Sequence, residues 1–202
     1  MEEKLAKVFS VLFHPMLVPT YALLLLFSLN SYISFCIPFA GKVTILGLVF
    51  SITFLIPVMF FLILKRRGMI QSVQMETKQE RVFPFLITAI FYYAAYFMLK
   101  KLDLPPIYYL VILGAALLVI VCLIINLWWK ISIHLTSMGG MLGAFIGMSL
   151  SMNIEMNLII CFLVLVSGIL ATSRLILKAH TPAQVYVGFF TGFISMILLF
   201  SL

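Results

Sequence analysis

The sequence predicts an all-α membrane protein, a polytopic transmembrane bundle of about six to seven spanning helices. Of its 202 residues, 64% are hydrophobic and only 9% are charged, whereas charged residues make up about a quarter of a typical soluble domain. The apolar residues are gathered in long runs, several of which approach the roughly 20 residues that a helix needs to cross a bilayer. The runs do not alternate between polar and apolar residues as barrel strands do, so each one is expected to be a helix.

A single integral-membrane domain is expected over residues 1–202, because the only sizeable polar stretch is 65–81 and the other connections are short. Boundaries of such segments are less certain in a sequence than their existence. The expected spans cover residues 16–37, 43–64, 83–99, 107–128, 134–151, 156–177 and 183–201.

Positive charge is distributed unevenly between the two sides of the expected bundle. If the seven helices alternate in direction, the N-terminus and the connections 65–82, 129–133 and 178–182 fall on one side, with ten of the 13 lysines and arginines. The positive-inside bias predicts that this side is cytoplasmic. The net charge of +7 is therefore ascribed to topology, lipid head groups or a phosphorylated ligand, and no nucleic-acid partner is expected.

Three polar islands lie on this side, at residues 78–81, 130–134 and 173–184. Ionisable residues between long apolar segments are functional candidates in a membrane protein. Because alternation places the three islands on one face, Arg81, His134 and His180 are expected to meet there.

The third island predicts an anion site at a helix N-terminus. Thr181 is a good N-cap, Pro182 suits the first helical position, and Gln184 completes a capping box. The free amides of such a helix attract anions, and Arg174 has the planar fork that suits phosphate oxygens. One histidine beside a bound phosphate can attack phosphorus while a second protonates the leaving oxygen, so neither a metal nor a cofactor is required.

Two further features bear on this site. Gly139, Gly140, Gly143 and Gly147 recur at the small-residue spacing that favours close packing of membrane helices, which would hold His134 in place. The His14-Pro15 pair introduces the first expected span, and His14 is expected at the membrane interface, with a role as a ligand as the alternative.

The islands resemble the three motifs of the type 2 phosphatidic acid phosphatase superfamily, K-x6-R-P, P-S-G-H and S-R-x5-H-x3-D. Ser173 and Arg174, followed after five residues by His180, are similar to the third motif up to its last position. Ser132 and His134 fall on the second and fourth positions of the second motif, with Ile131 and Ile133 in place of its proline and glycine. In the first motif the spacing differs, because Lys78 precedes Arg81 by three residues rather than seven and Pro84 follows it by three. The resemblance covers residues 76–195.

The resemblance implies an integral-membrane lipid phosphatase in which His180 is the nucleophile and His134 is the general acid. It implies that the partner is a phosphorylated membrane lipid, and bacterial members of the family usually place the site at the periplasmic face of the inner membrane, opposite to the prediction from charge. The phosphate-binding residues would be Lys78, Arg81, Ser132, Ser173 and Arg174.

Gln184 stands where the family has an aspartate that orients and charges the nucleophilic histidine. An amide can accept the hydrogen bond of that histidine, but it cannot stabilise an imidazolium by charge. Its single oxygen is expected either to cap Thr181 or to accept from His180, and not to serve both fully. The alternative function is therefore a catalytically silent relative that binds phosphorylated lipid, and a transporter is a weaker third possibility.

Each candidate also has an ordinary structural interpretation. His180 could cap a helix end, and His134 could be a satisfied interfacial histidine. Ser132 and Gln184 could serve as helix caps, and Lys78 with Arg81 could belong to a basic loop at the lipid head groups.

Overall fold

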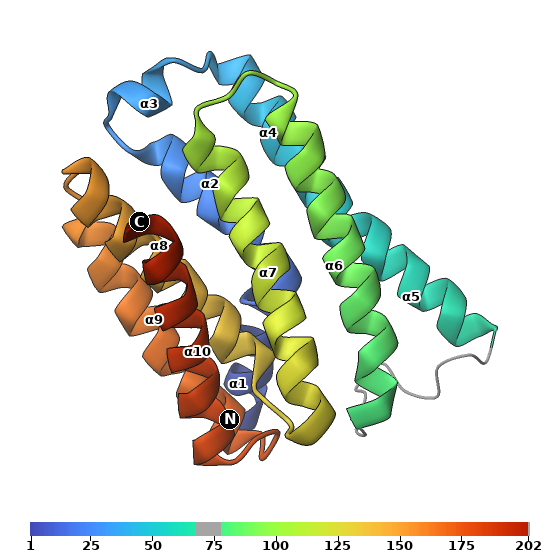
Figure 1. Ribbon diagram of the computed structural model, residues 1–202. Coiled ribbons are helices and arrows are strands. Elements are labelled where there is room, and N and C mark those ends of the chain that lie inside the picture. The colour runs from blue at the N-terminus through green and yellow to red at the C-terminus, as the bar shows by residue number, and fades with distance from the viewer. Residues whose placement is uncertain (68–77, 202) are drawn as a thin grey trace. The chain divides into compact units, whose positions relative to one another are not determined.

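The computed structural model describes residues 1–67 and 78–201, without the side chains of residues 78–81. Every regular element in these residues is a helix (Figure 1), which confirms the all-α prediction. Seven helical segments in this part of the chain are long and apolar enough to cross a membrane. The elements are α1 (Glu2–Leu12), η1 (Pro15–Leu17), α2 (Val18–Ser28), α3 (Tyr32–Phe35), α4 (Phe39–Phe50), η2 (Ser51–Leu55), α5 (Ile56–Arg66), α6 (Lys78–Lys100), α7 (Pro106–Trp128), α8 (Ile133–Met152), α9 (Asn157–Ile176) and α10 (Pro182–Ser201).

The first span was predicted wrongly, whereas the other six lie within a few residues of the predicted ones. The structure places the first candidate span at Glu2–Ser28 rather than at 16–37. The helix ends at Ser28 because Asn30 and Ser31 favour turns, and the short helix α3 starts after Ser31. The His14-Pro15 break consequently lies in the middle of this span rather than before it.

The chain divides into two compact units. Unit 1 contains Met1–Leu25 and Ile131–Leu202, and unit 2 contains Leu26–Lys130. In unit 2, α6 packs along α7, and α6 also contacts η2 and α5. The region that resembles the phosphatase family is shared between the two units, and the expected single domain stays a prediction.

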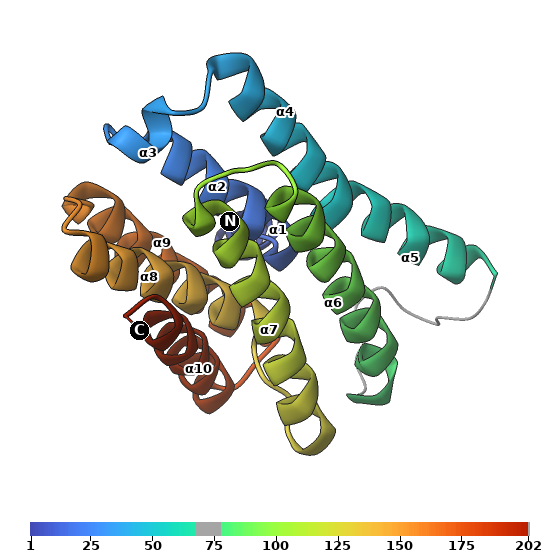
Figure 2. The ribbon, with the colours of Figure 1, turned by 45° about the horizontal axis from the view of Figure 1, so that its top comes forward.

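In unit 1, α8 and α10 lie side by side (Figures 1 and 2). Their backbones approach with almost no side-chain layer between them. A Cβ atom added at Gly139 would overlap the backbone carbonyl of Phe189, and one added at Gly143 would overlap that of Phe193. On the opposite helix, a Cβ atom at Gly192 would overlap the carbonyl of Thr136. The close packing predicted from the glycines of α8 is confirmed.

The register of these contacts shows that α8 and α10 run in the same direction. Gly139 meets Phe189 and Gly143 meets Phe193, so the residue numbers of both helices rise in the same direction along the interface. The N-termini of the two helices therefore lie at one end of unit 1, as the alternation of spans predicts for the connections before α8 and before α10. Helix α9 connects them in the sequence and runs in the opposite direction, so its C-terminus reaches the same end.

We expect Gly192→Ala to destabilise the protein by about 1–3 kcal/mol, because the added methyl group would force α8 and α10 apart. The matched control is Gly168→Ala in α9, where a Cβ atom would meet no described atom within 4 Å. Alanine at that site should leave stability unchanged or raise it by about 0.5–1 kcal/mol. Thermal unfolding in detergent micelles, followed by circular dichroism, measures both, and equal effects at the two glycines would contradict the packing argument.

Candidate functional site

The three histidines of the chain gather with Arg174 in unit 1. The rings of His14 and His134 lie edge to face, with 5.6 Å between their centroids. Arg174 interacts electrostatically with both of these imidazoles, and His180 does so with His134. The structure thus brings together His134, Arg174 and His180, as the sequence predicts, and adds His14.

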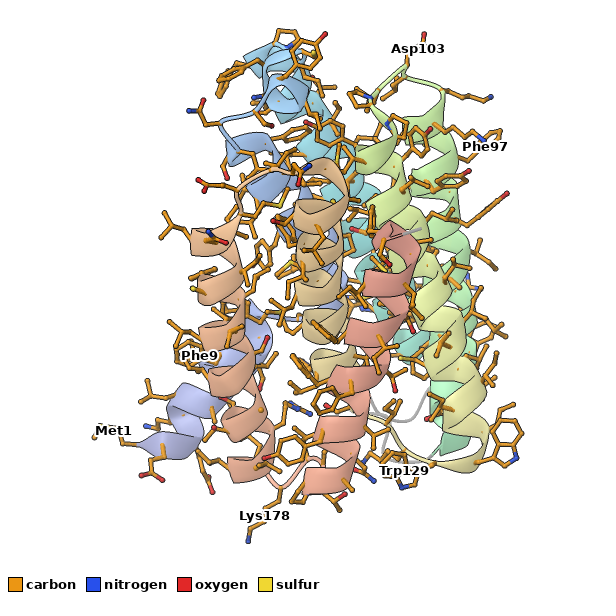
Figure 3. All side chains as sticks on the ribbon, turned by 60° about the vertical axis from the view of Figure 1, so that its left-hand side comes forward. Met1, Phe9, Phe97, Asp103, Trp129 and Lys178 are labelled. Atoms are coloured by element: carbon orange, nitrogen blue, oxygen red, sulfur yellow. The ribbon has the colours of Figure 1, made fainter. Side chains whose placement is uncertain are left out.

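A sharp turn between α9 and α10 carries Arg174 and His180 to this cluster. The N–H of Ala179 donates to the carbonyl of Arg174 at 3.2 Å, and the N–H of Lys178 donates to that of Leu175 at 2.9 Å. Lys178 takes the left-handed conformation, with φ 50°. These features make a Schellman motif, with Lys178 at the tip of the turn (Figure 3). The motif ends α9 within one turn of Arg174 and returns the chain directly to His180.

The predicted capping box forms at the start of α10. The hydroxyl oxygen of Thr181 accepts from the Gln184 N–H at 3.4 Å, and the Gln184 side-chain oxygen accepts from the Thr181 N–H at 3.2 Å. Pro182 is the first helical residue, as expected. The helix therefore begins directly after His180.

The same oxygen of Gln184 also contacts His180 Nδ1 at 3.0 Å. The expectation that Gln184 must choose between the cap and the histidine is wrong, because a carbonyl oxygen has two lone pairs. An atom that accepts from a backbone N–H has to be the oxygen, so His180 Nδ1 must carry the hydrogen of the second bond. The lone pair of the neutral His180 ring is therefore on Nε2, so Nε2 is the nucleophilic nitrogen of this ring.

The segment before α8 is tied to the first turn of α10 through its backbone. The Ser132 N–H donates to the Gln184 carbonyl at 3.3 Å. Ser132 is completely buried, and its hydroxyl has no hydrogen-bond partner among the described residues. Its side chain makes no capping bond to α8, so the capping interpretation of Ser132 is wrong. In α9, the Ser173 hydroxyl donates to the Ile169 carbonyl at 2.8 Å.

His14 is the residue that sequence reasoning placed wrongly. It lies beside His134, and its Nδ1 accepts from the Met16 N–H at 3.4 Å at the start of η1. The rule that an ionisable residue inside a span is a functional candidate would have found it. Because the predicted first span begins at residue 16, His14 falls outside it and the rule does not reach this residue.

Lys78 and Arg81 belong to α6 in unit 2, and their side chains lie outside the described residues. Their predicted roles in phosphate binding stay predictions. The same holds for the expectation that Arg81 joins the two histidines at one face.

Two features of the cluster suit a bound anion. Arg174 carries a permanent positive charge, and the positive ends of the α8 and α10 dipoles lie at the same end of unit 1. Of the carboxylates in unit 1, Glu155 lies in the connection between α8 and α9, at the far end of these helices, whereas Glu2 lines a hollow beside Ser173 and Ile176 of α9. Among the residues that the structure describes, no group of three or more His, Cys, Asp or Glu side chains is arranged to hold a metal ion.

The described residues define an all-α protein with seven helical segments suited to a membrane and a cluster of three histidines around Arg174. No family model, no curated protein and no solved structure matches the chain. Function is therefore inferred from the residues of the site and from the motifs that they resemble.

We expect Lys178→Gly to stabilise the protein by about 1 kcal/mol, because glycine adopts the left-handed conformation without the steric cost that a Cβ atom carries. Lys178→Val should destabilise it, since a β-branched residue fits this conformation poorly. Thermal unfolding measures both variants. A loss of stability with glycine would contradict the assigned Schellman motif.

Proposed function

We propose that this chain is a metal-independent phosphatase that removes a phosphate from a membrane lipid phosphate or diphosphate through a phosphohistidine. The observation that carries the proposal is the orientation of His180. Gln184 holds its Nδ1–H and so places its lone pair on Nε2, while Arg174 and His134 belong to the same cluster. The resemblance to the type 2 phosphatidic acid phosphatase motifs supports the same roles.

Arg174 is proposed to bind the phosphate group. A guanidinium presents a planar fork of N–H donors that matches two phosphate oxygens, which a lysine cannot reproduce. Its backbone is fixed by the hydrogen bond from Ala179, so the fork starts from a defined position. The helix N-termini at this end add partial positive charge without adding a mobile side chain.

The first chemical step forms a bond between His180 Nε2 and phosphorus and breaks the bond from phosphorus to the lipid oxygen. The departing oxygen takes a proton from His134, so the lipid leaves as an alcohol, or as a monophosphate if the substrate is a diphosphate. Gln184 holds the other nitrogen of His180 during this step. Its dipole stabilises the cationic ring less strongly than a carboxylate would.

The second step is hydrolysis of the phosphohistidine. Water attacks phosphorus and gives one proton to His134, which lost a proton in the first step. The bond from phosphorus to Nε2 breaks, and its electron pair returns to His180. Inorganic phosphate leaves, and both histidines regain their starting protonation states. All proton transfers use the residues of the cluster, so the reaction requires no metal.

The test is phosphate release by the purified protein from phosphatidic acid, phosphatidylglycerol phosphate, a polyprenyl diphosphate and a phosphorylated lipopolysaccharide anchor. We expect release from at least one of these lipids, with the same rate in the presence of a chelator. His180→Ala should abolish it because no nucleophile remains. Arg174→Lys should reduce it strongly because a point charge replaces the two-pronged contact. A protein that releases no phosphate from any of the four lipids would contradict the proposal.

The second candidate function is that of a silent relative that binds phosphorylated lipid without hydrolysing it. Gln184 favours this candidate, because the amide brings no negative charge to His180. In the serine-protease triad, loss of the corresponding charge lowers turnover by about 10⁴-fold. The geometry of Gln184 makes the two candidates separable.

Gln184→Glu keeps the length of the side chain, and its carboxylate can accept from both His180 and Thr181. If the chain is a phosphatase, we expect turnover to rise by about tenfold or more, because the carboxylate stabilises the imidazolium and suits a helix N-terminus. Gln184→Asp introduces the residue of the family and should act in the same direction. If the chain only binds lipid phosphate, hydrolysis should stay at background and affinity should fall, because a negative charge is placed beside the anion.

The proposed location is the inner membrane of a bacterium, with the site at the periplasmic face. This face is chosen by resemblance, whereas the charge distribution predicts the cytoplasmic face. Cations that bind phosphate are constrained by that role, so they report topology less directly than the other lysines and arginines.

A further inference from the structure

His134 has a backbone partner that lies outside all three motifs. Its Nε2 is 3.1 Å from the carbonyl oxygen of Ser10, which precedes it by 124 residues. A backbone carbonyl only accepts hydrogen bonds, so Nε2 must carry the hydrogen. In the neutral His134 ring the lone pair is therefore on Nδ1.

The ring of His14 makes a second contact with His134 from the same segment. The two rings lie at 83°, edge to face, so His14 limits how the His134 ring can turn. His14 is itself fixed at the start of η1 through the Met16 N–H. The Tyr21 hydroxyl donates to the Leu12 carbonyl at 2.9 Å and braces the break between α1 and α2.

Helix α1 is also anchored to the helix that carries Arg174. It packs along α9, and Ala6 and Ser10 are the buried residues of α1. Phe9 lies beside α9 (Figure 3). The position of the Ser10 carbonyl is thus set by the helix that positions the proposed phosphate ligand.

We propose that residues 10–14 position His134, and that His134 exchanges its catalytic proton through Nδ1. The catalytic part of this proposal rests on the proposed phosphatase function. The first step starts from the doubly protonated ring, whose Nδ1–H gives its proton to the departing lipid oxygen while Nε2–H stays on the Ser10 carbonyl. In the second step the neutral Nδ1 takes the proton of the attacking water. The Ser10 carbonyl orients the ring and stabilises its cationic form by its dipole.

Nitrogen NMR of the full chain in detergent micelles tests the positioning directly, without any need for turnover. With only three histidines, ¹⁵N-histidine labelling gives three imidazoles, which His14→Phe and His180→Ala assign. We expect the neutral His134 to hold its hydrogen on Nε2 and the neutral His180 to hold it on Nδ1. A neutral His134 with its hydrogen on Nδ1 would overturn the proposal.

Kinetics test the catalytic part with two substrates. His134→Ala should lower turnover of a lipid phosphate by about 10²–10⁴-fold, and that of p-nitrophenyl phosphate far less, because its leaving group needs no proton. His14→Leu should give the same pattern with a smaller loss of turnover, about tenfold to a hundredfold for the lipid phosphate, because the His134 ring is misplaced. His14→Phe should restore most of the loss since it keeps the edge-to-face contact. Equal losses on both substrates with His14→Leu would contradict a role through His134.

A bulky side chain introduced on either face of α1 provides a second, matched pair of variants. Ala6 is 3% exposed and Val8 is 61% exposed, so Ala6→Phe should push α1 away from α9 while Val8→Phe should not. Ala6→Phe is expected to mix the two neutral forms of His134 in the NMR spectrum and to produce the same substrate pattern as His14→Leu. If circular dichroism shows that the Ala6→Phe variant is folded and its His134 signal is unchanged, the positioning role is overturned. If the wild-type chain releases no phosphate, the proposed function fails, and the NMR result still decides the positioning.

Discussion

The contact of α8 with α10, backbone against backbone, is the constraint on which the site depends. Glycine at 139, 143 and 192 lets the two helices approach until main-chain atoms touch, and close approach of this kind is how membrane helices gain packing energy without a hydrophobic driving force. The contact also sets the register between the helices. At their N-terminal end, this register allows the Ser132 N–H to reach the Gln184 carbonyl. The packing of the two helices therefore determines where α8 begins and where His134 lies.

Most of the fold could be predicted from the sequence because it depends on local and periodic features. Length and apolarity define six of the seven spans, the Thr181 capping box defines the start of α10, and glycine spacing defines one helix interface. The place of His14 could not be predicted in this way. Its partner is His134, and nothing near residue 14 in the sequence records that contact. The error at the first span had a physical cause as well. The charged residues Glu2, Glu3, Lys4 and Lys7 at the start of α1 shift the apolar window toward the C-terminus, although the helix itself begins at Glu2 and ends before the turn at Asn30.

Gln184 serves both the cap of α10 and the candidate site. Its side-chain oxygen stabilises the first turn of α10 and orients His180, while its main chain holds the segment before α8. Helix capping alone would explain a glutamine at this position, so its presence is compatible with either function. What decides between the functions is the charge that an amide lacks, because stabilisation of an imidazolium depends on charge more than on geometry.

The contact between Ser10 and His134 also bears on how the protein is made. Ribosomes add roughly 5–20 residues per second, so the 124 residues between the two partners take roughly 6–25 seconds to synthesise at that rate. During this interval α1 has been synthesised, whereas α8 and α9 have not. The site is closed only when the last two helices arrive.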